Sequence, residues 1–167
     1  MASTDSQESI ADIVKADVIN LIKKQRLLRL VEGGRFQVCT TKGRAKDRYW
    51  LCKLSPNHRT LHYGPVSDNK DKTIDELPDK INVSDIKRIL IGRESHLKKT
   101  AIDLAFTIVY ESNHEEYLNF VCTDQRTFSH WTDGLNALIN SPMNSEKFHE
   151  DLQMLTRIEL KMRSISK

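Results

Sequence analysis

The segment FSHWTDGLNALIN, residues 128–140, places a tryptophan on an apolar helical stripe after a long run of strand-like segments. The spacing of three, four and three residues puts these apolar side chains on one helical face: Phe128, Trp131, Leu135 and Leu138. Asp124 and Thr127 both suit the N-cap, and Ser141-Pro142 ends the helix. A single helix after an all-β region must bury its apolar stripe against that region. We therefore predict that it forms a lid over one open end of a β-barrel or sandwich.

The region before this helix alternates apolar and polar residues with a period of two, which is typical of half-buried strands. Seven short strands are predicted, over residues 35–41, 48–54, 60–63, 81–83, 86–92, 102–110 and 117–122. Short polar segments join them, and the longest predicted loop covers residues 64–79. The pattern predicts a mainly β fold with helices: a seven-stranded antiparallel β-barrel or sandwich capped by a C-terminal helix.

Two further helices are predicted on either side of the β region. In the first, residues 9–31, apolar residues recur every three or four positions, and Gly33-Gly34 ends the helix. In the second, residues 145–165, apolar residues follow near-heptad spacing. The sequence therefore divides into an N-terminal helical extension (9–31), a central β domain (32–141) and a C-terminal helical extension (144–166).

Composition limits the function classes. A chain of 167 residues with a net charge of +3 is expected to form one domain with extensions, and it has no basic tail for nucleic acid. Cys39, Cys52 and Cys122 are an odd number without ligand spacing, so neither a disulfide framework nor a zinc site is predicted. The sequence has neither a signal-peptide pattern nor an apolar run of about 20 residues, the length of a membrane span. We expect a cytoplasmic protein.

No catalytic signature is present. Ser55 and Cys52 are candidate nucleophiles, but neither occurs in a known arrangement with a base and an orienting residue. The glycine-containing stretch Lys42-Gly43-Arg44 has too few glycines to cradle a phosphate group. The sequence therefore predicts a protein that is not an enzyme and needs no cofactor or metal.

Several contiguous segments carry a family resemblance. They are LIKKQRLLRLVEG (21–33), RYWLCKLSPNHRTLHYG (48–64), LAFTIVYES (104–112), YLNFVCTD (117–124), WTDGLNALIN (131–140) and DLQMLTRIELKMRSI (151–165). Together with the helical Trp131 and the pair Tyr49-Trp50, they resemble the pleckstrin-homology (PH) region of the engulfment and cell-motility (ELMO) family and the helix after it. The resemblance runs from about Ile13 to Ile165. The loops at 70–80 and 93–101 depart from the family pattern, as surface loops commonly do.

The resemblance implies a non-catalytic scaffold. Proteins of this family bind DOCK-family exchange factors, and the pair activates the GTPase Rac in actin remodelling, phagocytosis of apoptotic cells and cell migration. It also implies a cytoplasmic protein that is recruited to the plasma membrane. A proline-rich segment beyond the last helix binds the SH3 domain of the exchange factor in this family, and the present sequence contains no PxxP motif.

The family's flanking helices take part in that contact, so the resemblance implies that the helical extensions of this chain bind the partner. Their apolar faces either pack on each other and on the β domain or are completed by a helix of the partner, and both can hold together. Periodicity does not separate these alternatives. The residues expected to bind the partner are Val18, Leu21, Ile22, Leu28, Leu152, Leu155, Ile158 and Met162.

An alternative function is membrane targeting through phosphoinositides. Four cations, Lys42, Arg44, Lys46 and Arg48, lie in the first predicted hairpin, and Lys46-x-Arg48-Tyr49 fits the end of a headgroup-binding pattern. Convergent cations suit adjacent phosphates because the arginine fork binds their oxygens in pairs. Asp47 lies among these cations, where its charge would repel a polyphosphate, and the inner part of the first strand has no lysine. Both features weaken the case for specific headgroup binding. Weak, non-specific contact with acidic lipid is a further alternative.

Overall fold

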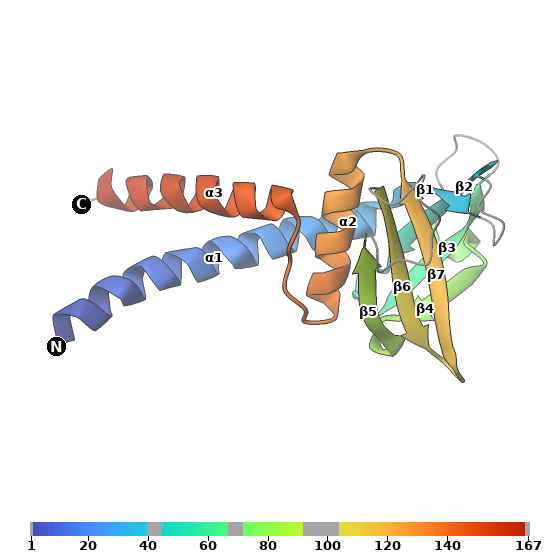
Figure 1. Ribbon diagram of the computed structural model, residues 1–167, viewed down its shortest axis with the longest axis horizontal. Helices are drawn as coiled ribbons and strands as arrows, with labels where there is room; N and C mark the ends of the chain where they lie inside the picture. The colour runs from blue at the N-terminus through green and yellow to red at the C-terminus, as the bar shows by residue number, and fades with distance from the viewer. Residues whose placement is uncertain (1, 40–44, 67–71, 92–103, 166–167) are drawn as a thin grey trace.

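The computed structural model describes residues 2–39, 45–66, 72–91 and 104–165, with side chains for residues 10–37, 49–66, 72–91 and 104–164. Within these ranges the chain forms one antiparallel sheet of seven strands and three α-helices (Figure 1). In chain order the elements are α1 (Ala2–Glu32), β1 (Gly34–Cys39), β2 (Ala45–Leu54), β3 (Thr60–Val66), β4 (Asp79–Asn82), β5 (Ile86–Ile91), β6 (Ala105–Glu111), β7 (Glu115–Cys122), α2 (Gln125–Leu138) and α3 (Glu146–Ile165).

The sheet has the strand order β4-β3-β2-β1-β7-β6-β5, which confirms the predicted seven-stranded antiparallel fold. β1 lies at its centre, because Phe36 pairs with Trp50 of β2 on one side and with Cys122 of β7 on the other. β4 and β5 are the outermost strands, and no pairing between them closes the sheet within the described residues. The architecture is therefore sandwich-like, and of the two predicted forms the closed barrel is wrong.

An aromatic core fills the inside of the bent sheet. The ring of Phe36 contacts the rings of Phe106 and Phe120, with centroids 5.7 Å and 4.9 Å away. Trp50 stacks on Tyr63 at 5.2 Å. Burial of several aromatic rings supplies much of the apolar area that a small domain can remove from water.

Helix α2 covers this core. Trp131 is 2% exposed, and its ring lies edge-on to Phe36 with centroids 4.9 Å apart. Leu135 is fully buried, and both Phe128 and Leu138 pack against the same cluster. Asp124 is the N-cap of the helix, and its carboxylate accepts a hydrogen bond from the backbone N–H of Thr127 at 2.7 Å. The predicted lid is confirmed.

The close approach of α2 to β1 explains why residue 34 is glycine. A Cβ atom placed on Gly34 would lie 2.6 Å from Nε1 of Trp131 and 2.9 Å from its Cε2. A side chain at this position would therefore push the tryptophan out of its place over the core. The first strand can meet the lid this closely only because residue 34 is glycine.

The first helix is longer than predicted. It begins at Ala2, whereas apolar periodicity predicts a start at residue 9. Residues 2–8 are polar but contain neither proline nor glycine, so nothing in them interrupts the helix. The predicted last helix, 145–165, agrees with α3 within one residue. Cys52 and Cys122 are buried free thiols, as expected, and the side chain of Cys39 lies outside the described residues.

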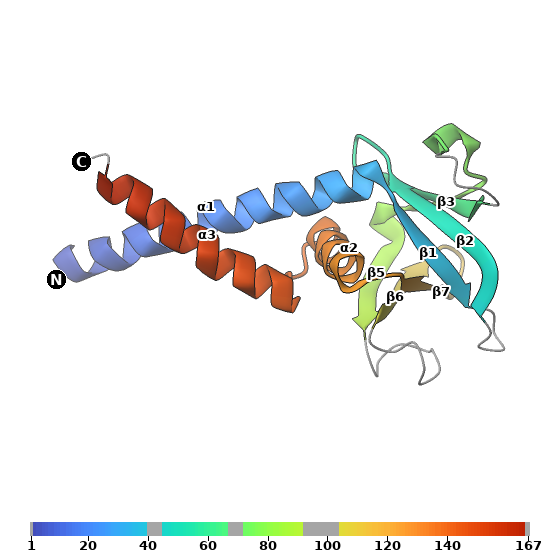
Figure 2. The ribbon, with the colours of Figure 1, turned by 90° about the horizontal axis from the view of Figure 1, so that it is seen from above.

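The flanking helices extend from the lid side of the sheet as a pair (Figures 1 and 2). Seen from above, α3 crosses α1, and the start of α1 and the end of α3 lie at the far end of the pair (Figure 2). A second apolar cluster joins them to the lid, and its buried members are Val14, Val18, Ile22, Ala137, Met143 and Phe148. The extensions are thus packed on the β domain through α2.

Candidate partner-binding surface on the flanking helices

One face of α1 is buried between Val14 and Leu30. Its members recur every fourth residue: Val14, Val18, Ile22, Arg26 and Leu30. The first three pack against α3 and the end of α2, while Leu30 belongs to the core of the β domain. Val18 and Ile22, which were expected to bind a partner, are therefore occupied inside the chain in this conformation.

A second face of α1 is exposed although it is apolar. Four large side chains on it are between 48% and 57% exposed: Ile10, Ile13, Leu21 and Leu28. Their spacing of three, eight and seven residues places them along one stripe, with Asp17 and Lys24 at the intervening positions. We call these four residues the α1 stripe. Leu21 and Leu28 were expected from the sequence to bind a partner, and they are accessible.

Helix α3 divides in the same way. Leu152 and Leu155 pack partly against the cluster shared with α1. Ile158 and Met162, both expected to bind a partner, are exposed, as are Met154 and Leu160; these four side chains are 40% to 61% exposed. Arg163 near the end of α3 lies 3.2 Å from the carboxylate of Asp17, so the end of α3 comes close to the α1 stripe.

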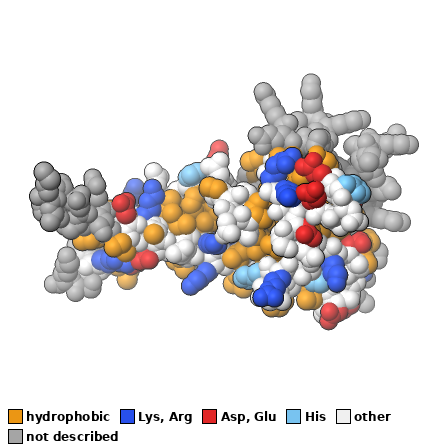
Figure 3. All heavy atoms as spheres, turned by 90° about the horizontal axis from the view of Figure 1, so that it is seen from below, with side chains coloured by type: hydrophobic (Ala, Val, Ile, Leu, Met, Phe, Trp, Pro, Cys, Tyr) orange, Lys and Arg blue, Asp and Glu red, His pale blue; other side chains and the backbone are white. Residues whose placement is uncertain are grey.

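The two helices also enclose a groove. A hollow of about 660 Å³ is lined by Lys15 of α1 and by residues of α3: His149, Glu150, Leu152, Gln153, Thr156, Arg157 and Leu160. The aliphatic side chains of Leu152 and Leu160 contribute apolar surface between charged rims. Hydrophobic side chains gather over the helical pair on the face drawn in Figure 3. Surface of this kind is typical of helix-in-groove recognition.

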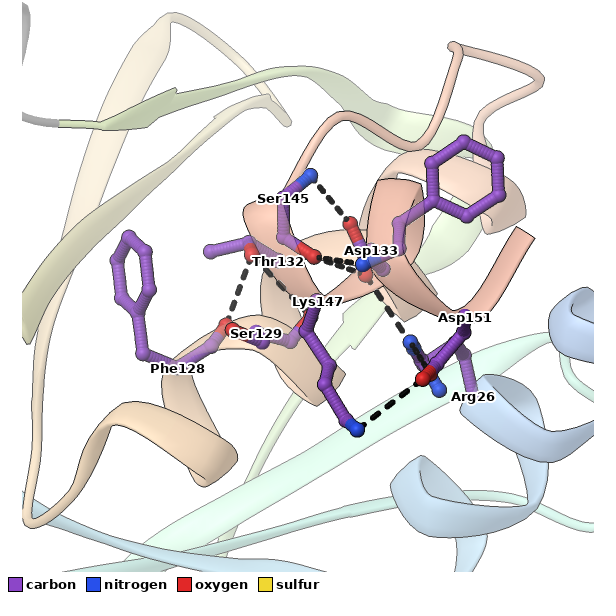
Figure 4. A network of polar contacts seen from close by, with 9 residues as sticks. Arg26, Phe128, Ser129, Thr132, Asp133, Ser145, Lys147 and Asp151 are labelled. Atoms are coloured by element: carbon purple, nitrogen blue, oxygen red, sulfur yellow. Dashed lines mark hydrogen bonds and ion pairs between the residues drawn. The ribbon is translucent and has the colours of Figure 1, made fainter. Parts of the chain in front are cut away.

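A buried ionic network holds the pair in place (Figure 4). Arg26, only 2% exposed, donates from Nε to Asp133 at 3.2 Å and from Nη2 to Asp151 at 3.0 Å. One guanidinium therefore joins α1 to both α2 and α3. Removal of one member should strongly destabilise the fold, because leaving a buried charge without its partner costs about 3–5 kcal/mol.

Two further groups complete the network. Ser145 donates from Oγ to Asp133 at 2.6 Å and accepts from the backbone N–H of Phe148 at 2.9 Å, so it also caps the start of α3. Lys147 pairs with Asp151 at 3.0 Å. Burial by itself would raise the pKa of Asp151, but the hydrogen bonds from Arg26 and Lys147 outweigh it and lower that pKa.

Sequence reasoning does not find this network. Arg26 and its two carboxylate partners are 107 and 125 residues apart, so no local motif connects them. One signal is present: Arg26 continues the i, i+4 series of Val14, Val18 and Ile22 at a position that is otherwise apolar. A charged residue on a buried helical stripe needs a partner of opposite charge.

The basic hairpin lies mostly outside the described residues. Lys42 and Arg44 fall in the segment that is not described, and Lys46 and Arg48 are described only as backbone of β2. Tyr49, which follows them, is 41% exposed. The lipid-binding alternative therefore stays a prediction.

Other kinds of site have little support in the described part of the chain. Its His, Cys, Asp and Glu residues form no group of three or more that could hold a metal ion. Burial raises the pKa of the Cys52 thiol, which keeps the sulfur protonated and unreactive. None of the helices described combines the length and the apolar character that crossing a bilayer requires.

Comparisons with known proteins agree with the fold. A family profile described as "Pleckstrin homology domain" matches residues 22–140. The solved structure named "PH domain from TgAPH" superposes with a TM-score of 0.50, covering 75% of this chain and 95% of that chain at 10% sequence identity. At this identity the superposition supports the fold alone.

Sequence relatives are more specific. The chain is 40% identical over 161 residues to engulfment and cell motility protein 1 of Mus musculus, 41% to protein 3 of Mus musculus and 38% to protein 2 of Homo sapiens. Each match covers 90% of this chain and 22% of the relative's length. The match includes the lid and most of the flanking helices as well as the strands. The chain belongs to the pleckstrin homology domain family, and it is similar to a part of the engulfment and cell motility proteins that makes up about a fifth of their length.

Proposed function

We propose that this chain is a non-catalytic scaffold module whose flanking helices bind a DOCK-family Rac exchange factor. Through that contact it promotes Rac activation, actin remodelling, phagocytosis of apoptotic cells and cell migration, in the cytoplasm and at the plasma membrane. The names of its relatives, which refer to engulfment and cell motility, support this assignment. SH3 binding, which the family resemblance implies through a proline-rich segment, is not assigned to any residue of this chain.

The observation that carries the proposal is the exposed α1 stripe. Four large aliphatic side chains on one helical face would ordinarily be covered in a soluble protein. Their helix is fixed to the domain by the Arg26 network, so the stripe is presented on a rigid element. A preorganised apolar face binds a partner helix without a further cost of ordering its own backbone.

A binding assay with matched variants tests the proposal. The N-terminal region of a DOCK-family protein is titrated into this chain by calorimetry. Replacement of Leu21 and Leu28 by glutamate should weaken binding by about tenfold or more, since loss of apolar contact at the centre of an interface costs about 2 kcal/mol or more. Both side chains are exposed, so the variant should keep its thermal stability.

Ile91→Glu is the control, because Ile91 is also an exposed aliphatic residue, 41% exposed, but lies on β5. It should bind as the unmodified chain does. Equal binding by the Leu21/Leu28 variant and the unmodified chain would exclude the α1 stripe as the contact. Co-sedimentation with phosphoinositide vesicles, with and without Lys46→Ala/Arg48→Ala, tests the alternative of membrane targeting.

A further inference from the structure

A polar hollow lies where the three helices meet. It comprises a larger part of about 560 Å³ and an adjacent smaller part of about 210 Å³, and both are lined by Arg29, Glu32, Arg126 and His130. The larger part is also lined by Arg26, Lys147 and Asp151. We call the two parts together the junction hollow. It lies at the base of the helical pair, apart from the groove between α1 and α3.

The carboxylates around the junction hollow already have partners. Asp124 caps α2 through the backbone of Thr127. Asp151 accepts from Arg26 and Lys147, and Asp133 accepts from Arg26 and Ser145. Glu32 pairs with Arg29 at 3.2 Å, and both side chains are about half exposed. The acceptors of the site are therefore largely engaged.

Several donors have no such partner. Arg126 forms neither a hydrogen bond nor an ion pair with any described residue. Arg26 uses Nε and Nη2, and its Nη1 has no acceptor in the part of the chain that is described. The ring nitrogens of His130 also lack a hydrogen-bond partner among the described residues. Among the described residues, Thr156 Oγ1 is the one buried side-chain polar atom without a hydrogen-bond partner, so Nη1 of Arg26 is accessible to solvent at the hollow that Arg26 lines. This nitrogen can therefore donate to a bound group.

Electrostatics agree with this surplus of donors. Burial and the nearby charges of Arg26, Arg29 and Arg126 lower the pKa of His130 to about 4, and Asp133 opposes them only in part. Lys147 and Asp151 of α3 and Glu32 of α1 also line the hollow. The imidazole is therefore neutral at pH 7 and lies in a positive potential created by guanidinium groups on two helices.

We propose that the junction hollow binds the phosphate group of a phosphorylated serine or threonine side chain on a partner protein. Guanidinium groups match phosphate oxygens because each can donate two parallel hydrogen bonds. Arg126 and Nη1 of Arg26 have donors free for this purpose, and Arg29 can exchange its exposed carboxylate partner for the ligand. A dianion matches the charge better than a carboxylate does, since the three guanidinium groups of Arg26, Arg29 and Arg126 line the hollow.

A protein is favoured over a membrane as the source because the junction hollow adjoins the α1 stripe. Leu28 is a member of that stripe and also lines the hollow. A peptide lying on the stripe would therefore bring a neighbouring side chain to the cations. This choice of source rests on the proposed function, whereas the affinity for a phosphate group does not.

The test measures anion binding by the whole chain without any exchange factor. Inorganic phosphate, and separately a phosphoserine peptide with its unphosphorylated form, are titrated at constant ionic strength while NMR signals of Arg126 and His130 are followed. Saturable shifts are expected with phosphate and with the phosphopeptide only. The pKa of His130 should rise in the presence of phosphate, because the anion stabilises the imidazolium form.

Matched variants identify the site. Arg29→Gln/Arg126→Gln should weaken phosphate binding by about tenfold, the effect of losing charge-assisted hydrogen bonds. Arg59→Gln, at an exposed arginine of the turn before β3, should leave it unchanged. Shifts that chloride reproduces, or binding retained in the double variant, would overturn the site. Binding confined to phosphoinositide vesicles would overturn the protein source. Unchanged exchange-factor binding by the Leu21/Leu28 variant would count against the proposed function but not against the phosphate site, because phosphate binding is measured on the unmodified chain without an exchange factor.

Discussion

Replacing Arg26 by methionine should destabilise the protein strongly while leaving the helix propensity of α1 almost unchanged. Methionine is a good helix former of similar length, so the main loss is the cation. Asp133, which is 1% exposed, and Asp151 then remain buried without their shared partner. Breaking a buried pair in this way costs about 3–5 kcal/mol. For a chain of this size the melting temperature should fall by about 6–20 °C.

The assay is urea denaturation followed by tryptophan fluorescence, with Arg29→Met as the control. Arg29 lies one turn away and pairs with Glu32 at the surface, so its replacement should change the free energy of unfolding by about 0.5 kcal/mol or less. A loss below about 1 kcal/mol in Arg26→Met would refute the inference that this network holds the three helices together.

The pH dependence of the free energy of unfolding is a second test of the Arg26 network. The folded-state pKa of Asp151 is lowered, so its ionised form stabilises the native chain above the unfolded pKa of about 3.9. That contribution is lost as pH falls through the folded pKa. In Arg26→Met, Asp151 loses one of the two hydrogen bonds that lower its pKa, so its ionised form contributes less to stability. The difference in stability between the two proteins should therefore narrow in acid, where Asp151 is protonated in both. A difference that stays constant from neutral to acid pH would contradict the electrostatic explanation.

Three further changes test the lid. Gly34→Ala should destabilise the fold by about 1–3 kcal/mol, because the new Cβ would meet the indole of Trp131; a denaturation curve and the tryptophan emission maximum report both effects. Asp124→Ala should lower the free energy of unfolding by about 1 kcal/mol, because the cap to Thr127 is lost. This difference should vanish as pH falls through the lowered pKa of Asp124, and chemical denaturation at several pH values would measure it. Leu135→Ala removes a fully buried side chain and should cost about 2–5 kcal/mol in the same assay; a loss under about 1 kcal/mol would contradict its place in the core.

Much of the fold can be predicted from local patterns. Period-two alternation locates all seven strands, and the spacing of Phe128, Trp131, Leu135 and Leu138 locates the lid and the face that it buries. These signals are strong because one face of each element packs on a single core, and burial of that face imposes the period on the sequence. The start of α1 is less well predicted, since residues 2–8 have no apolar stripe to mark it.

The candidate surface could be predicted only in part. The apolar residues of α1 cover more than one face, so their periodicity indicates a helix but not which side another element covers. Val18 and Ile22 contact α3 and the end of α2, while Leu21 and Leu28 stay exposed. This division depends on the angle at which α3 crosses α1 (Figure 2).

By itself the sequence determined the seven strands, the lid helix with Trp131 and the family to which the domain belongs. Those features arise from periodic burial and contiguous motifs, which are local properties of the chain. Only the tertiary structure decided which helical residues are accessible, and that Arg26, Asp133 and Asp151 form one network with the junction hollow beside it. The physical reason is distance along the chain: these contacts join residues more than 100 positions apart, and packing of three helices brings them together.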